Sequence, residues 1–286
     1  MKKLCLIFVL ILCFCSPSSQ NSGKGLKVFI GADMEGLSGV VSSRECSSSG
    51  PDYNYFREIM TREVNAAIEG ALAAGAAEIL VRDGHGSGTN ILPELLHKKA
   101  KLLRSWSGGP KSMMEGIDET FDAVVFIGYH AKAGTPDGIV AHTMSGNVID
   151  VSINGVSLPE AGINALIAGS YNVPVVFASG DKALCNQVKE LFGEVETYAV
   201  KEGIGGAELG VHPEVARENI RKSVERALRN RAHYKPYKLN PPFTLSLKVK
   251  EEKPELYPGT VKNAPGDFTY TSSDIMDIIT AFYKMH

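Results

Sequence analysis

Cysteine is scarce in this chain once its first residues are set aside. Of the 5 cysteines, Cys5, Cys13 and Cys15 belong to the N-terminal segment, which leaves Cys46 and Cys185. Two cysteines are too few for a disulfide framework, although a single disulfide stays open in an oxidising compartment. They also lack the paired spacing of a structural zinc site, so any metal ion must be held by His, Asp and Glu.

An excess of positive charge is also lacking. The chain has 30 Lys and Arg against 32 Asp and Glu, a formal net charge of −2, and a single tryptophan. Without a basic stripe or a platform of aromatic side chains, a general nucleic-acid binder is excluded. The 286 residues, 44% of them hydrophobic, are enough for one large domain or two. No internal repeat or low-complexity tract follows the N-terminal segment.

The N-terminal segment has the pattern of an export signal. Two lysines precede an apolar run from Leu4 to Cys15, and a polar stretch follows. The run is too short to cross a bilayer comfortably and is typical of a secretory signal peptide. We therefore expect residues 1–24 to be a signal peptide and the protein to be exported, either periplasmic or associated with the cell envelope. Leu12-Cys13-Phe14-Cys15 is similar to a lipoprotein box, so lipidation of Cys15 also stays open.

Strand-like and helix-like segments alternate along residues 25–205. Apolar runs predict buried strands, and three- and four-residue spacing of apolar side chains predicts helices between them. This alternation indicates an α/β fold, with a mostly parallel central sheet flanked by helices. The predicted strands are 27–30, 78–81, 102–106, 123–127, 148–153, 173–178 and 195–199, and the predicted helices are 52–74, 92–99, 159–168 and 181–191.

The alternation of strand-like and helix-like segments ends near residue 206, and we expect residues 206–286 to form a smaller C-terminal α+β lobe. A long charged helix is predicted over 213–231, and Pro241-Pro242 interrupts the chain after it. The alternation over 244–250 predicts an edge-like strand, with 259–261 and 268–270 as pairing partners. A terminal helix over 272–283 completes the lobe.

Metal-ligating side chains follow three of the predicted strands. Asp33 and Glu35 come after the first, His85 after the second, and His130 after the strand at 123–127. Singly, each is more simply a solvated or turn-capping residue. Together they point to a metal site, because parallel strands end at one edge of a sheet and His and carboxylates are common zinc ligands. Glu160, at a helix start, can reach the same edge.

The remaining histidines differ from these. His97, His212, His233 and His286 lie in charged helices, beside a proline or in polar tails, and we interpret all four as surface residues. Asp83 and Asp181 either orient a ligating imidazole or act as turn and N-cap residues.

Five short signatures give a specific resemblance. They are Asp33-Met34-Glu35-Gly36, Asp83-Gly84-His85, Gly128-Tyr129-His130-Ala131, Ala141-His142-Thr143-Met144 and Glu160-Ala161-Gly162-Ile163-Asn164-Ala165. In this order they resemble the DppA family of D-aminopeptidases, which are dinuclear zinc peptidases (peptidase family M55). The resemblance runs from about residue 27 to the C-terminus.

The resemblance implies a site with two zinc ions per subunit. The family's metal ligands fall on Asp33, Glu35, His85, His130 and Glu160, with Asp33 bridging both ions. The family's catalytic histidine falls on His142, as nucleophile or as general acid/base. Two close metal ions polarise the scissile carbonyl and lower the pKa of the attacking water. The implied activity is removal of N-terminal D-amino acids, of the D-Ala type, from short peptides by a homo-oligomer, a decamer of stacked rings.

The chain departs from the family pattern in three respects. Gly84 stands where a serine is found in a relative, the loop between His130 and His142 is one residue longer, and the export segment is extra. Two alternatives therefore stay open: a metallohydrolase with the same site that acts on L-peptides or other amides, and an exported binding lipoprotein without catalysis. The intact ligand set together with His142 favours an enzyme.

Overall fold

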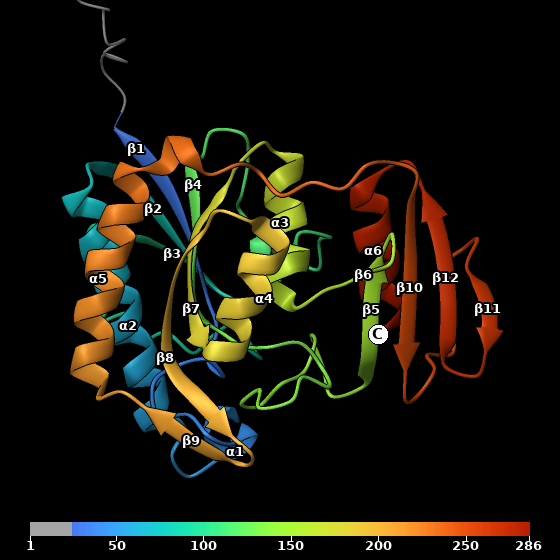
Figure 1. Ribbon diagram of the computed structural model, residues 1–286, viewed down its shortest axis with the longest axis horizontal. Coiled ribbons are helices and arrows are strands. Elements are labelled where there is room, and N and C mark those ends of the chain that lie inside the picture. The colour runs from blue at the N-terminus through green and yellow to red at the C-terminus, as the bar shows by residue number, and fades with distance from the viewer. Residues whose placement is uncertain (1–24) are drawn as a thin grey trace, which may run out of the picture.

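The largest sheet is built as the alternating pattern predicts. The computed structural model describes residues 25–286, which form two β-sheets with helices packed against them (Figure 1). The 7-stranded sheet has the order β3-β2-β1-β4-β7-β8-β9, and every neighbouring pair is parallel except β8 with β9. Its strands are β1 (Leu26–Ala32), β2 (Ala76–Asp83), β3 (Lys101–Leu103), β4 (Ala123–Tyr129), β7 (Val175–Asp181), β8 (Glu196–Ile204) and β9 (Ala207–Gly210).

Helices cover both faces of this sheet, which confirms the predicted α/β class. One face carries α2 (Tyr53–Ala73) and α5 (Pro213–Arg229), which pack against each other, and the opposite face carries α3 (Glu160–Ser170) and α4 (Lys182–Phe192) (Figure 1). Side chains along β1 alternate between the faces, so Val28 and Ile30 join the core under α2 while Phe29 joins the other core.

A second sheet of five strands lies beside the first. Its order is β11-β12-β10-β5-β6, all antiparallel, and α6 (Ile275–Met285) packs on β10 and β12 (Figure 1). An Asn154-Gly155 hairpin turn joins β5 to β6, and both residues have positive φ, 53° and 78°. The strands are β5 (Val148–Ile153), β6 (Val156–Ser157), β10 (Phe243–Val249), β11 (Val261–Ala264) and β12 (Asp267–Ser272).

Several local predictions were wrong. The strand predicted as an edge, 244–250, is the middle strand β10, because β5 pairs with its other side. Residues 92–99 form turns, since Pro93 and the short apolar pattern do not support a helix. The strand predicted to reach Trp106 ends at Leu103. Residues 37–50 contain a short helix, α1 (Ser43–Cys46), and two further short helices are η1 (Ser112–Met114) and η2 (Arg231–His233).

Elements from the two sides of the predicted domain boundary pair and pack with one another. The β5–β6 hairpin, which precedes residue 205, pairs with β10, and α5, which follows it, packs on α2. The division after residue 205 therefore stays a prediction. The predicted signal peptide, residues 1–24, lies outside the described residues. Within residues 25–286, no helix has both the length and the apolar character needed to cross a bilayer.

Candidate metal centre

The predicted ligands meet at the carboxyl ends of three adjacent strands. β1 lies between β2 and β4, and Ala32 is opposite Asp83 on one side and Ile127 on the other. Asp33 and His130 follow the ends of β1 and β4, and His85 follows β2. β1 ends at Ala32, so Glu35 reaches the site through a turn and not as part of the strand.

Two glycines in the signatures allow this turn to lie against β4. The Gly36 amide donates to the Gly128 carbonyl at 2.8 Å, and a Cβ on Gly36 would come within 1.7 Å of the Tyr129 carbonyl oxygen. Gly128 has a φ of +72°, and a Cβ there would lie 2.3 Å from the Asp33 carbonyl oxygen. The close approach of the two backbones brings the Asp33 turn next to His130.

Each of the two histidines at the strand ends faces two carboxylates. His85 Nδ1 lies 3.1 Å from Asp33 Oδ1 and 3.0 Å from Glu35 Oε2. His130 Nε2 lies 3.6 Å from Asp33 Oδ2 and 3.3 Å from Glu160 Oε1. The three carboxylates and His130 are buried. Asp33 thus presents one oxygen to each histidine.

Backbone carbonyls fix the orientation of both rings. His85 Nε2 lies 2.9 Å from the Cys46 carbonyl oxygen, and His130 Nδ1 lies 3.0 Å from that of Ala131. Because a carbonyl only accepts, these nitrogens carry the hydrogen. The other nitrogen of each ring therefore faces the carboxylates, with its lone pair free for a metal ion when the ring is neutral.

Two atoms of this cluster are left without a directed partner. Glu35 Oε2 and His130 Nε2 are buried and make no well-formed hydrogen bond to any residue in the 25–286 range. Ligand atoms of Asp33, Glu35 and His130 lie within 4.8 Å of one another, as do those of His130, His142 and Glu160. Buried carboxylates this close repel one another unless positive charge lies between them, so the donor set fits metal ions.

The ionisation of the cluster depends on the same crowding. Burial and the neighbouring Glu35 raise the pKa of Asp33 to about 7. Burial lowers the pKa of His85, but Glu35 and Asp33 outweigh it and raise that pKa to about 12. Burial also lowers the pKa of His130, but Glu160 outweighs it and raises that pKa to about 10. Without metal, protons on the two rings therefore balance the carboxylates.

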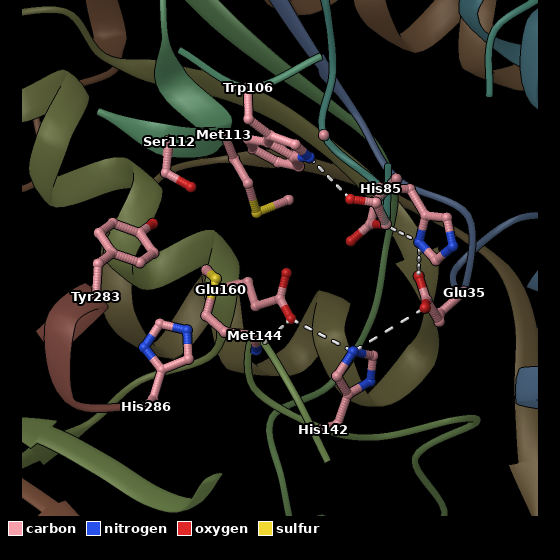
Figure 2. A pocket seen from close by; sticks show the side chains of 13 residues that line it. Glu35, His85, Trp106, Ser112, Met113, His142, Met144, Glu160, Tyr283 and His286 are labelled. Atoms are coloured by element: carbon pink, nitrogen blue, oxygen red, sulfur yellow. Dashed lines mark hydrogen bonds and ion pairs between the residues drawn. The ribbon is translucent and has the colours of Figure 1, made fainter. Parts of the chain in front are cut away.

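His142 lies at the open side of the cluster. Its Nδ1 lies 2.9 Å from the Val140 carbonyl oxygen, and its Nε2 lies 3.6 Å from Glu160 Oε1 and 4.0 Å from Glu35 Oε1 (Figure 2). Val140 and Met144, on either side of it, have φ of 53° and 62°. Such strained conformations are retained where the surroundings hold the loop firmly, often at functional sites.

A cavity of about 430 Å³ opens onto these side chains. His85, Glu35 and His142 lie on one side of it, Ser112, Tyr283 and His286 lie on the other, and Glu160 lies between them (Figure 2). Asp33, Trp106, Met113 and Met144 also line the cavity. The interpretation of His286 as a surface residue was wrong, because α6 places it in the cavity wall. Its helical spacing from Tyr283 was the signal that could have found both.

Asp83 and Asp181, for which the sequence left two roles open, accept hydrogen bonds from backbone amides and not from imidazole rings. Asp83 accepts hydrogen bonds from the backbone amides of Asn90 and Ile91, at 2.6 Å and 2.7 Å, and so closes the loop that carries His85. Asp181 accepts from the Leu184 amide as the N-cap of α4 and from the Ile139 amide before His142. The turn and N-cap interpretation is therefore the right one.

A buried lysine, which the sequence pattern did not indicate, contacts the loop that carries Glu35. Lys201 Nζ donates to the Glu35 carbonyl at 2.5 Å and to the Val40 carbonyl, although 166 residues separate Lys201 from Glu35. The Ser38 amide and hydroxyl in the same loop donate to Glu63 of α2. Nothing in the local sequence around Lys201 indicates this contact.

Comparison with known proteins gives a consistent result. The Peptidase M55 family model, described as D-aminopeptidase, matches residues 26–283. A D-aminopeptidase from Bacillus subtilis (strain 168) is 34% identical over 268 residues, which span 91% of this chain and 96% of that protein. Among solved structures, the Zn-dependent D-aminopeptidase DppA from Bacillus subtilis, described as a self-compartmentalizing protease, superposes with a TM-score of 0.85 at 32% identity. It covers 91% of this chain and 96% of its own.

These matches span nearly all of the described residues and include every signature on which the resemblance rests. The expected family is thereby confirmed, and the metal-ligand geometry at the strand ends agrees with a hydrolase of that family. The chain belongs to the M55 family of D-aminopeptidases.

Proposed function

We propose that this protein is a zinc-dependent aminopeptidase that removes D-amino acids, of the D-Ala type, from the N-terminus of short peptides. The observation that carries the proposal is the group of three buried carboxylates, buried His130 and half-buried His85. Within it, Glu35 Oε2 and His130 Nε2 make no well-formed hydrogen bond to the described residues. Nitrogen and carboxylate oxygen donors in one cluster suit zinc. The named activity of the relatives supports the same conclusion.

The contacts support two zinc ions per subunit. Asp33 Oδ1, Glu35 Oε2 and His85 Nδ1 face one another and would hold one ion. Asp33 Oδ2, Glu160 Oε1 and His130 Nε2 would hold the other. Asp33 would then bridge the two ions, because its Oδ1 faces His85 and its Oδ2 faces His130.

The chemistry divides between the metal ions and His142. Bound zinc ions would polarise the scissile carbonyl and lower the pKa of the attacking water. His142 lines the cavity, and its Nδ1 hydrogen is held by the Val140 carbonyl, so Nε2 is the nitrogen available to substrate. Proton transfer at His142 Nε2 would serve bond cleavage and protonation of the leaving amine.

The assembly and the location of the protein belong to the same proposal. The related structure is described as self-compartmentalizing, which supports a homo-oligomer for this chain. The family resemblance implies that the oligomer would be a decamer. Ile204 and Leu209 of the β8–β9 hairpin are 60% and 61% exposed and offer an apolar contact surface for it. The lysines and the apolar run within residues 1–24 support export, with Cys15 as a candidate lipid anchor.

A pair of dipeptides tests the activity. We expect zinc-loaded protein to hydrolyse D-Ala-D-Ala and to leave L-Ala-L-Ala nearly intact, with activity lost on chelation and restored by zinc. L-selective cleavage would keep the metallohydrolase and remove the D-peptide assignment. Zinc binding without hydrolysis of a broad D- and L-peptide panel would instead favour a binding protein.

A further inference from the structure

The cavity wall opposite the metal cluster comes from the last helix of the chain. Tyr283 of α6 and His286, which directly follows α6, line the cavity across from His142 and Glu35, and Ser112 of η1 lies beside Tyr283 (Figure 2). These residues belong to none of the five signatures. The two ends of the cavity thus differ: anionic carboxylates on one side, and neutral hydroxyl and imidazole groups on the other.

Tyr283 carries a polar atom that the fold leaves unused. Its hydroxyl is buried and makes no hydrogen bond to the part of the chain that the structure describes. Burial raises the pKa of Tyr283, although the nearby Ser112 side chain opposes the rise, so the hydroxyl stays protonated and able to donate. A buried hydroxyl without a hydrogen-bond partner destabilises the folded chain. A ligand that accepts a hydrogen bond in the cavity would remove that cost.

Its neighbours define what kind of ligand fits. His286 Nδ1 lies 2.9 Å from the Phe282 carbonyl oxygen and therefore donates to it, which leaves Nε2 as an acceptor in the neutral ring. Burial lowers the pKa of His286 and favours that neutral form. Hydroxyl donors next to an imidazole acceptor match the alternating carbonyl and N–H groups of a peptide main chain.

The position of Ser112 is fixed from outside the cavity. Ser112 has a φ of 47°, and its carbonyl accepts from Arg82 Nε at 3.3 Å. The same guanidinium donates to the Ser105 carbonyl at 2.6 Å and lies 4.4 Å from the centre of the Trp106 ring. Arg82 is fully buried, so this wall of the cavity is held before any substrate arrives.

We propose that Tyr283, supported by Ser112, donates a hydrogen bond to a main-chain oxygen of the residue that follows the scissile bond. This deepens the proposed function and rests on it, because it places the N-terminal amine and the scissile bond at the metal cluster. A cavity of about 430 Å³, lined by both the metal cluster and Tyr283, has the volume to hold a dipeptide. The oxygen is either the terminal carboxylate of a dipeptide or the carbonyl of a longer peptide.

Three substrates and one substitution test this contact. The substrates are D-Ala-D-Ala, its C-terminal amide, and D-alanine amide, which has no second residue. We expect Tyr283→Phe to raise KM for D-Ala-D-Ala about tenfold, the loss of about 1.4 kcal/mol, and to leave D-alanine amide unchanged. An effect on D-Ala-D-Ala alone identifies the carboxylate as the acceptor, and an equal effect on its amide identifies the carbonyl. Equal effects on all three substrates, or on none, would overturn the proposal.

A binding measurement separates this proposal from the proposed function. Trp106 is the single tryptophan and lines the cavity, so its fluorescence reports occupancy. In the zinc-loaded His142→Ala background, D-Ala-D-Ala should bind about tenfold more weakly when Tyr283→Phe is added. Failure of the parent enzyme to hydrolyse any peptide would remove the proposed activity, while this comparison would still decide the contact. Equal affinity with and without the hydroxyl, or no binding to the parent, would overturn it.

Two controls exclude a merely structural effect. Tyr55→Phe removes the hydroxyl of a tyrosine that is 58% exposed on α2 and should change neither KM nor binding. Tyr283→Phe should leave the melting temperature of the metal-free protein unchanged or raise it, because the lost hydroxyl has no partner in residues 25–286. A melting temperature that falls with the affinity would assign the effect to folding and contradict a substrate contact.

Discussion

The rings of His130 and His142 stack face to face, with centroids 4.1 Å apart and planes 11° from parallel. His130 is buried, whereas His142 lines the cavity. Their Nε2 atoms both approach Glu160 Oε1, at 3.3 Å and 3.6 Å. One carboxylate oxygen therefore lies between a candidate metal ligand and the candidate catalytic residue, and the stacking fixes the distance between them.

Substitution should separate the two roles. In His142→Ala we expect kcat to fall at least about 10²-fold, because proton transfer at Nε2 is lost. Bound zinc should stay near the wild-type amount, since the other five candidate side chains are unchanged. Asp33→Ala is the matched comparison and should lose both zinc and activity. Metal analysis and kinetics on both proteins check this, and equal zinc loss in the two would contradict the division of roles.

Zinc binding should release protons. In the metal-free protein the pKa values of His85 and His130 are raised to about 12 and about 10, so both rings are charged at neutral pH. We expect about two protons to leave per chain as zinc binds at pH 7, and zinc affinity to rise with pH. Calorimetric titration in buffers of different ionisation enthalpy measures the release. Binding without proton release would contradict the histidine ligands.

The same pKa values predict a falling stability of the metal-free protein in alkali. Both histidine pKa values are raised above the usual 6.5, so their contribution is fully present below pH 6.5. It is lost as the pH rises through about 10 and about 12. Urea unfolding of the apo-protein from pH 6 to pH 10 tests this, with the zinc-loaded protein as the control that should not show the same decline.

Lys201→Met should weaken zinc binding without removing a ligand. The lysine holds the Glu35 and Val40 carbonyls, and methionine can hold neither. Loss of such support for a ligand lowers metal affinity about 10–100-fold. Competition with a fluorescent chelator measures it. Lys182→Met is the control, because Lys182 is 52% exposed and, among residues 25–286, its ammonium group pairs with Glu202. Equal zinc affinity in the two variants would show that Lys201 does not position Glu35.

Arg82→Met should loosen the cavity wall that carries Trp106. The substitution removes hydrogen bonds to the Ser105 and Ser112 carbonyls and the guanidinium against the indole ring. We expect a loss of about 2–4 kcal/mol in the free energy of unfolding and a red shift of tryptophan emission. Arg62→Met, on the exposed side of α2, should show neither change. If the emission does not shift, the position of Trp106 does not depend on Arg82, which would contradict this prediction.

The sequence predicted the features that depend on local pattern. Buried strands such as 123–127 are continuous apolar runs, and a parallel order brings their carboxyl ends together, which is why Asp33, His85 and His130 could be grouped. The D-M-E-G and G-Y-H signatures also have a local cause, the close approach of Gly36 to Gly128. These parts of the site follow from alternation, strand order and glycine geometry.

The features that depend on distant contacts were not predictable from local pattern. Lys201 reaches Glu35 across 166 residues, and no periodicity encodes that pairing. His286 sits in a short polar tail by sequence, yet α6 turns it into the cavity. The strand 244–250 has the alternation of an edge strand, but β5 of the β5–β6 hairpin, which lies far earlier in the chain, pairs with its other side. In each case tertiary packing overrides a correct local pattern.

Metal content of the purified protein tests the central claim most directly. Mass spectrometry of the native protein, with zinc added and excess removed, counts the ions per chain. The geometry around Asp33 predicts close to two zinc ions, both lost on dialysis against a chelator together with D-Ala-D-Ala hydrolysis, and both regained with zinc. A protein that holds no zinc, and gains no activity when zinc is added, would contradict the metal centre at the ends of β1, β2 and β4.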